Sequence, residues 1–142
     1  MTVIITDTGF AADDWTEGFV ALSAEGEVAN DIKALDLPSD VFPENLGNAI
    51  AKVDFIRIDF PSAADGRGFT IARQLRLMGF KGRLRAKGHV LADQYAMARR
   101  SGFDEVEISD ELAARQPEDQ WQFRADWQAH DYQNRLRAKA ST

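Results

Sequence analysis

The chain has 142 residues, of which 44% are hydrophobic, and its formal net charge is -6. This is the size of one ordinary domain, so we expect a single domain over 1–142. The absence of cysteine excludes disulfides, thiolate metal sites, cysteine-ligated iron-sulfur clusters and a catalytic thiol. No stretch has the pattern of a secretory signal or the length of a membrane span, so we expect a cytoplasmic protein with no membrane partner.

Four short apolar or alternating runs are predicted to form strands, and helical patterns follow them. The runs are 32–37, 55–60, 83–87 and 103–108. The intervening helices are expected to begin near Pro43, Gly68 and Leu91. This βα rhythm is typical of a parallel sheet covered by helices.

The helix after the second strand has the clearest pattern. Three apolar residues follow Ile71 at one, four and seven positions, a spacing that predicts one helix face turned to the core. The four residues are Ile71, Ala72, Leu75 and Met78. Gly79 is expected to end this helix as a C-cap, and Gly102 to end the next one.

The two ends of the chain carry weaker signals. Residues 3–5 predict a peripheral strand, and the tail from about 111 is helix-permissive and charged, with Trp121, Phe123, Trp127 and Tyr132. We expect the tail to pack across the sheet or to reach a partner. The prediction is an α/β fold with a mainly parallel sheet of four to five strands and flanking helices. Doubly wound and half-barrel-like sheets both fit, and the open edges of a half-barrel would favour a homodimer.

Positive charge is concentrated between Gly66 and Phe103. This window holds nine of the 17 Lys and Arg residues and a single acid, Asp93, so its formal charge is +8. A field of one sign attracts ligands or partners of the other sign. The expected partner is therefore a small anion or an acidic protein surface. The acidic balance of the whole chain argues against nucleic acid.

The segment after the second predicted strand is the first candidate site, because ligands of parallel sheets bind beyond the carboxyl ends of the strands. It reads Asp65, Gly66, Arg67 and Gly68. Glycines permit a tight turn beside a helix start, and an arginine there can grip an oxyanion with two N–H groups. The alternative is a purely structural turn in which Asp65 caps the helix and Arg67 pairs with Asp65 or Asp59.

The third predicted strand is the second candidate. Side chains alternate across a strand, so Leu84 and Ala86 should face one way, and Arg83, Arg85 and Lys87 the other. A cationic face on a central strand needs water, counter-ions or acidic partners. A solvated face and a partner-binding face are both open alternatives.

Two further groups have weaker patterns. His89 and Asp93 lie one helical turn apart, which could orient an imidazole for proton transfer, although no nucleophile accompanies them. Helix capping by His89 and neutralisation of the basic surface by Asp93 is the favoured interpretation. The acids Asp104, Glu105 and Glu107 are expected to be solvated surface rather than a catalytic carboxylate pair.

Two blocks of this sequence resemble the bacterial family known as domain of unknown function 934. The first runs from Phe60 to Arg73 and contains Asp65-Gly66-Arg67-Gly68. The second runs from Gly82 to Gln94 and contains Leu84, Arg85, Gly88 and Asp93; the match continues through Arg99 to Asp104 and ends with Tyr132-Gln133. At His89 the family usually has an acid, so the resemblance favours Asp93 and Arg85 over His89 as functional residues. The resemblance implies an accessory place in sulfur assimilation, beside assimilatory sulfite reductase, and the label of an oxidoreductase in sulfite reduction.

Two hypotheses follow. In the first, the protein is a non-catalytic accessory of sulfite or sulfate reduction that docks through its basic face on sulfite reductase or another acidic redox protein, with Arg83, Lys87 and Gln94 at the contact. No flavin or nicotinamide motif is visible, so we expect no cofactor and no internal electron carrier. In the second, the protein is an enzyme or sensor whose ligand is a small oxyanion. This second hypothesis requires Asp65, Arg67, Arg85 and Asp93 to converge on one pocket, with Gly66 and Gly68 shaping the turn.

Overall fold

The computed structural model describes residues 2–21 and 32–125. The strands are β1 (Thr2–Thr6), β2 (Gly9–Ala11), β3 (Val20–Ala21), β4 (Ala34–Leu37), β5 (Phe55–Phe60), β6 (Arg83–Gly88) and β7 (Glu105–Ser109). The α-helices are α1 (Gly47–Ile50), α2 (Arg67–Leu77), α3 (Tyr95–Ser101), α4 (Asp110–Arg115) and α5 (Glu118–Arg124). Two short 3-10 helices, η1 (Pro43–Asn45) and η2 (Ala92–Gln94), precede α1 and α3.

All seven strands form one sheet in the order β2-β1-β7-β6-β5-β4-β3. The strands from β3 to β7 are parallel, whereas β1 and β2 are antiparallel to their neighbours. The predicted α/β class and mainly parallel sheet are confirmed. The predicted count of four to five strands is too low, because β2 has three residues and β3 has two, too few to produce a readable alternation.

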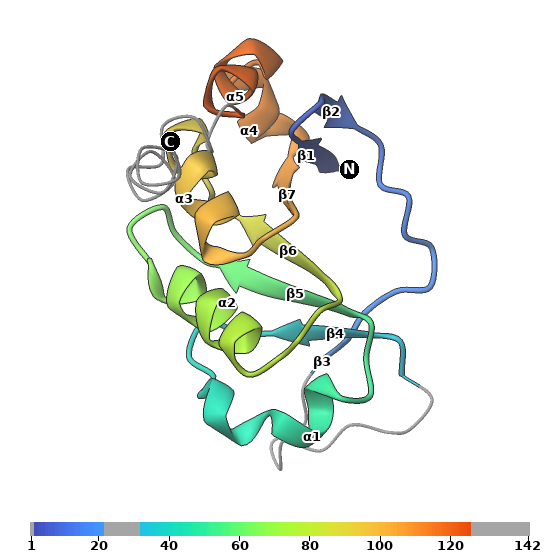
Figure 1. Cartoon of the computed structure of the whole chain (residues 1–142). Coiled ribbons are helices and arrows are strands. Elements are labelled where there is room, and N and C mark those ends of the chain that lie inside the picture. Colours follow the sequence, from blue (N-terminus) through green and yellow to red (C-terminus); the bar gives the residue numbers. More distant parts are fainter. Residues whose placement is uncertain (1, 22–31, 126–142) are drawn as a thin grey trace, which may run out of the picture.

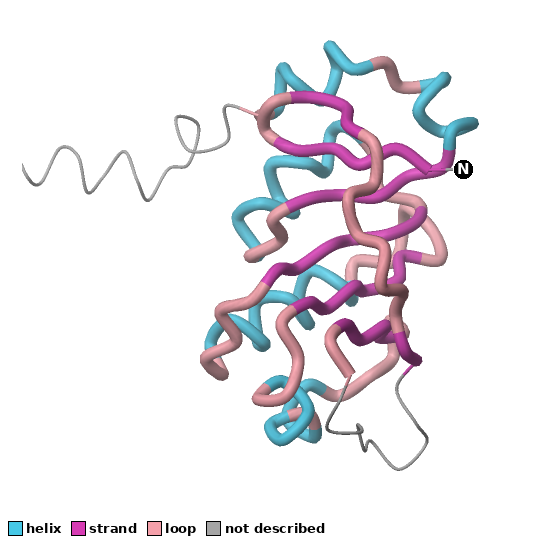
Figure 2. Tube along the Cα trace, turned by 90° about the vertical axis from the view of Figure 1, so that its right-hand side faces the viewer, coloured by secondary structure: helices cyan, strands magenta, loops and turns pink. Residues whose placement is uncertain are grey.

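The helices α2 and α3 pack on one face of the sheet. From β7 to β3 the strand order follows the chain order without a reversal, whereas a doubly wound sheet reverses direction. Figure 1 shows α2 on one side of the strands and the segment between β2 and β3 on the other, and Figure 2 shows that segment crossing the strands. The order is therefore that of a singly wound sheet and not of the doubly wound sheet that was one of the two predicted arrangements.

The main core lies between the sheet and α2. Residues of β5 and β6 alternate, and their buried apolar side chains face the helices; they are Ile56, Ile58, Phe60, Leu84 and Ala86. From α2 come Ile71, Ala72 and Leu75, as predicted. Met78 is 39% exposed, because the helix ends there and Gly79 reverses the chain with a φ of 103°.

The C-terminal helices complete the fold beside β1 and β2. Trp121 of α5 is 1% exposed, packs edge-on against Tyr95, and donates its indole N–H to the carbonyl of Gln116 at 2.9 Å. The tail therefore packs on the domain as far as Arg124. Trp127, Tyr132 and Gln133 lie outside the described residues. Within the described ranges, no helix has the length and apolarity needed to span a bilayer.

Candidate functional site

The cations of β6 lie on the sheet face opposite the helices, as the alternation predicted. Arg85 is aligned with Arg57 of β5 and Glu105 of β7, while Leu84 and Ala86 face the helices. Arg85 is completely buried. A charged group can be buried only when it is paired, because the loss of hydration is otherwise too costly.

The partners of Arg85 come from within the chain. Its Nε donates to Glu105 at 2.6 Å, and its Nη1 donates to Glu107 at 2.8 Å. Asp13, in the segment between β2 and β3, accepts from Nη1 and Nη2 at 3.1 Å. Burial lowers the pKa of Arg85, but its hydrogen bonds to Asp13, Glu107 and Glu105 and the charge of Glu105 outweigh burial, so its pKa is raised.

The pairing extends across the sheet as a charge ladder, a name we use for Asp36, Arg57, Glu107, Arg85, Glu105 and Arg83. The signs alternate along it. Arg57 forms ion pairs with Asp36, 2.6 Å from its Nε, and with Glu107, 3.1 Å from its Nη1. At the other end of the ladder, Arg83 forms ion pairs with Glu105 and Asp14. Glu105 and Glu107 are each 4% exposed. Their prediction as solvated surface was wrong, because the arginines of the neighbouring strands bury them.

Aromatic rings cover the ladder. The ring of Phe19 lies 3.8 Å from the guanidinium carbon of Arg57, and the ring of Phe55 lies 4.9 Å from that of Arg85. Trp15 contacts Phe55 edge-on at 5.0 Å. The crossing segment thus shields the ion pairs from water and supplies two of the acids. The basic strand face that the sequence predicted is neutralised within the molecule at Arg83 and Arg85.

The glycine turn holds Arg67 in a structural ion pair. Nε and Nη2 of Arg67 donate to the two oxygens of Asp65 at 2.9 and 2.7 Å, and its backbone N–H donates to Asp65 at 3.1 Å. The hydrogen bonds from Arg67 hold the pKa of Asp65 well below its usual range. Arg67 thus pairs with Asp65, as in the structural alternative that the sequence left open, whereas the N-cap residue of α2 is Gly66 and not Asp65.

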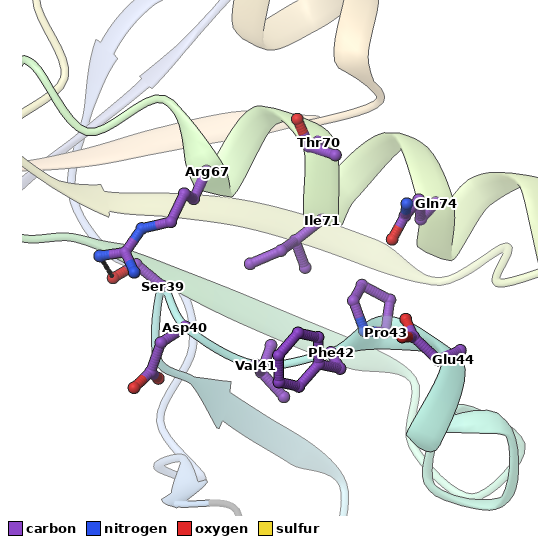
Figure 3. Close-up of a pocket in the computed structure, with 10 residues that line it drawn as sticks. All are labelled: Ser39, Asp40, Val41, Phe42, Pro43, Glu44, Arg67, Thr70, Ile71 and Gln74. Atoms are coloured by element: carbon purple, nitrogen blue, oxygen red, sulfur yellow. Dashed lines mark hydrogen bonds between the residues drawn. The ribbon is translucent and has the colours of Figure 1, made fainter.

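Arg67 also lies at one end of a cleft between the β4–η1 loop and α2 (Figure 3). Its Nη2 donates to the Ser39 hydroxyl at 3.0 Å. The cleft has a volume of about 480 Å³ and an apolar middle made by Val41, Phe42, Pro43 and Ile71. Asp40 and Glu44 add two negative charges to its lining, so the cleft is poorly suited to an anion.

The remaining predicted residues do not join Arg67. Asp93 is paired with Arg124 of α5 at 3.0 Å, and its side chain is 84% exposed. The Gln94 amide donates to the carbonyl of Ala63 at 3.0 Å and accepts from the Leu91 N–H at 2.9 Å, so it braces two loops. Arg85 lies on the other face of the sheet. The single pocket containing Asp65, Arg67, Arg85 and Asp93 is therefore absent from the described part of the chain.

Gly68 has a packing reason that Gly66 lacks. A Cβ at Gly68 would lie 2.4 Å from the ring of Phe60, whereas one at Gly66 would meet nothing closer than 3.9 Å. Phe60 is buried between Phe69 and Phe103, so its ring has little room to move.

We expect Gly68→Ala to lower the free energy of unfolding in urea by about 1–3 kcal/mol through overpacking. Gly66→Ala should cost less than about 1 kcal/mol, and equal losses would refute the packing explanation.

A third feature, missed from the sequence, is a groove between α2 and α3, which lie side by side in Figure 1. It has a volume of about 470 Å³ and is lined by Phe69, Thr70, Arg73, Gln74, Leu77, Met97, Arg100 and Ser101. Leu77 is 81% exposed and Met97 is 47% exposed. Arg73 and Arg100 form no hydrogen bond or ion pair with any described residue. One sequence signal was available: Leu77 lies off the apolar stripe of α2 and four residues after Arg73.

Neither the groove nor the ladder resembles a metal centre. Within residues 2–21 and 32–125, no group of three or more histidines or acids is arranged to hold a metal ion.

A family model described as a bacterial protein of unknown function (DUF934) matches residues 34–142. The match begins at β4, so it includes the glycine turn, both walls of the groove and all four strands of the charge ladder. No curated protein and no solved structure matches the chain.

Proposed function

The chain belongs to the bacterial DUF934 family, whose function is unknown, and on this premise we propose that it is an accessory protein that docks on an acidic redox partner. The docking surface is the groove between α2 and α3. The occupant is an amphipathic, acidic segment of the partner, with carboxylates for the arginines and apolar side chains for the centre of the groove.

One observation carries this proposal: Arg73 and Arg100 are exposed and unpaired among the described residues beside exposed Leu77 and Met97. Exposed apolar side chains bordered by charge are typical of interaction sites. Arginine is favoured at such sites because its guanidinium binds carboxylates through two N–H groups while its stem packs on apolar groups. The groove offers both kinds of contact to the same ligand.

The proposal moves the docking surface away from β6. Arg83 and Arg85 already bond carboxylates of this chain, and a partner would have to displace them. Gln94 is likewise occupied. Lys87 remains unpaired among the described residues, but it lies at the carboxyl edge of the sheet and not on the groove.

The place of this docking in sulfite or sulfate reduction rests on the sequence resemblance alone. The alternative, an enzyme or sensor for an oxyanion at the Asp65-Gly66-Arg67-Gly68 turn, has weaker support. Arg67 already donates two of its N–H groups to Asp65. The negative charges of Asp40 and Glu44 in the same cleft disfavour a further anion.

Reversing the charge of the groove tests the docking. With a partner in hand, we expect the double variant Arg73→Glu, Arg100→Glu to weaken binding at least about tenfold, equivalent to about 1.4 kcal/mol. Its matched control is Lys52→Glu, Lys81→Glu, which changes the net charge equally at exposed positions outside the groove. Isothermal titration calorimetry measures both. Equal losses in the two variants would mean that only net charge matters and that the groove is not the contact.

A further inference from the structure

A cavity separate from the cleft and the groove lies at the carboxyl ends of β6 and β7. It has a volume of about 280 Å³ and is lined by Thr2, Lys87, Gly88, His89, Glu107, Ile108, Ser109, Glu111, Leu112 and Arg115. This edge is where parallel sheets bind their ligands. It lies away from the docking groove, and none of the groove residues lines it.

Lys87 is the residue in this cavity that most needs an explanation. It is half-buried and lies between Asp59 and Glu107 in the strand register. Even so, its ammonium forms no hydrogen bond or ion pair within the described part of the chain. Every other cation on this face of β6 is fully paired. A partly desolvated, unpaired ammonium is costly unless it meets an anion.

The two acids that line the cavity do not satisfy this lysine. Both carboxylate oxygens of Glu107 are within hydrogen-bond distance of Arg57, and one of them also accepts from Arg85. Glu111 pairs with Arg115 one turn along α4, and both side chains are mostly exposed. Ion pairs between exposed side chains contribute little to stability, so a bound anion can replace Glu111 as the partner of Arg115.

Gly88 places the neighbouring side chains. Its φ is 121°, and a Cβ there would lie 2.5 Å from the carbonyl oxygen of Phe60. The His89 N–H donates to that same carbonyl at 2.9 Å. The glycine thus lets the end of β6 turn tightly against β5, with Lys87 and His89 both on the wall of the cavity.

We propose that this cavity binds a small tetrahedral oxyanion, held by Lys87 and Arg115 with His89 as a third donor. The volume is below the range of about 300–1,000 Å³ that is usual for larger organic ligands, and it leaves room for one such ion with water. Lysine and arginine are the side chains that bind these ions most strongly. The site does not depend on the docking groove, and neither result decides the other.

The test is a titration of the ¹⁵N-labelled full-length protein with sodium sulfate and, separately, with sodium phosphate, each against sodium chloride at equal ionic strength. We expect saturable shifts of the Gly88 and His89 amide signals with at least one of the two oxyanions. Lys87→Gln should weaken binding at least about tenfold, whereas Lys81→Gln, at an exposed site outside the cavity, should leave it unchanged.

Arg115→Gln provides a second variant on the exposed surface of α4, where folding is not at risk. It should weaken binding several-fold, because it removes one of the two charges on the ion. Shifts that follow ionic strength alone would overturn the proposal. So would equal affinities in the Lys87, Arg115 and Lys81 variants.

Discussion

Replacing Arg85 by Gln is expected to destabilise the protein by about 3–5 kcal/mol, the range for breaking a buried ion pair from one side. Arg85 is fully buried and contacts Glu105, Glu107 and Asp13. Without its charge, the nearly buried Glu107 and Glu105 keep only Arg57 and Arg83, respectively, as cationic partners. The cost arises from these uncompensated charges and not from lost volume.

Urea unfolding followed by circular dichroism measures this loss. Arg73→Gln is the matched control: it makes the same change at an exposed arginine without a described partner and should shift stability by no more than about 0.5 kcal/mol. Because domains of this kind are stable by only about 5–15 kcal/mol, the comparison is best made at low temperature. A loss below about 1 kcal/mol for Arg85→Gln would contradict the ladder as a structural element.

Trp121→Ala is expected to cost about 3–5 kcal/mol, as large-to-small changes of buried aromatic residues do. The side chain is 1% exposed, packs on Tyr95, and bonds the carbonyl of Gln116. Its loss leaves a cavity under α5 and an unpaired carbonyl.

Phe123→Ala on the same helix is the control for Trp121. Phe123 is 74% exposed, so its truncation should change the free energy of unfolding by less than about 0.5 kcal/mol. Thermal and urea unfolding of both variants compare them directly. Similar values for the two would mean that α5 is not packed on the domain.

The parts of the fold that the sequence predicted are those with strong periodicity. The strands β5 and β6 and the stripe of α2 show clear two- and three-to-four-residue patterns, and Gly79 and Gly102 mark helix ends by their positive φ. The short strands β2 and β3 were missed because two or three residues carry no pattern. Their position depends on pairing with β1 and β4, which is a tertiary effect.

The candidate site was less predictable, because the sequence alone does not show which arginines and carboxylates form ion pairs. Arg83, Arg85 and Lys87 were correctly placed on one face, but the counter-charges of the two arginines come from residues 20 to 72 positions away. The alternation of Glu105 and Glu107 in the next strand was the available signal. Arg67 had two interpretations, an anion ligand and a structural partner of a nearby acid, and in the structure it bonds Asp65, two residues before it. The groove was missed because its two walls come from different helices.

The proposed docking is electrostatic, and binding to sulfite reductase components over a range of salt concentrations tests that claim. Immobilised protein should retain a component at low salt and release it as ionic strength rises, because exposed charges are screened beyond about 10 Å at 0.1 M salt. The Arg73→Glu, Arg100→Glu variant should retain little at any salt concentration. Retention that is independent of salt, or no retention of any component by the unmodified protein, would contradict the claim.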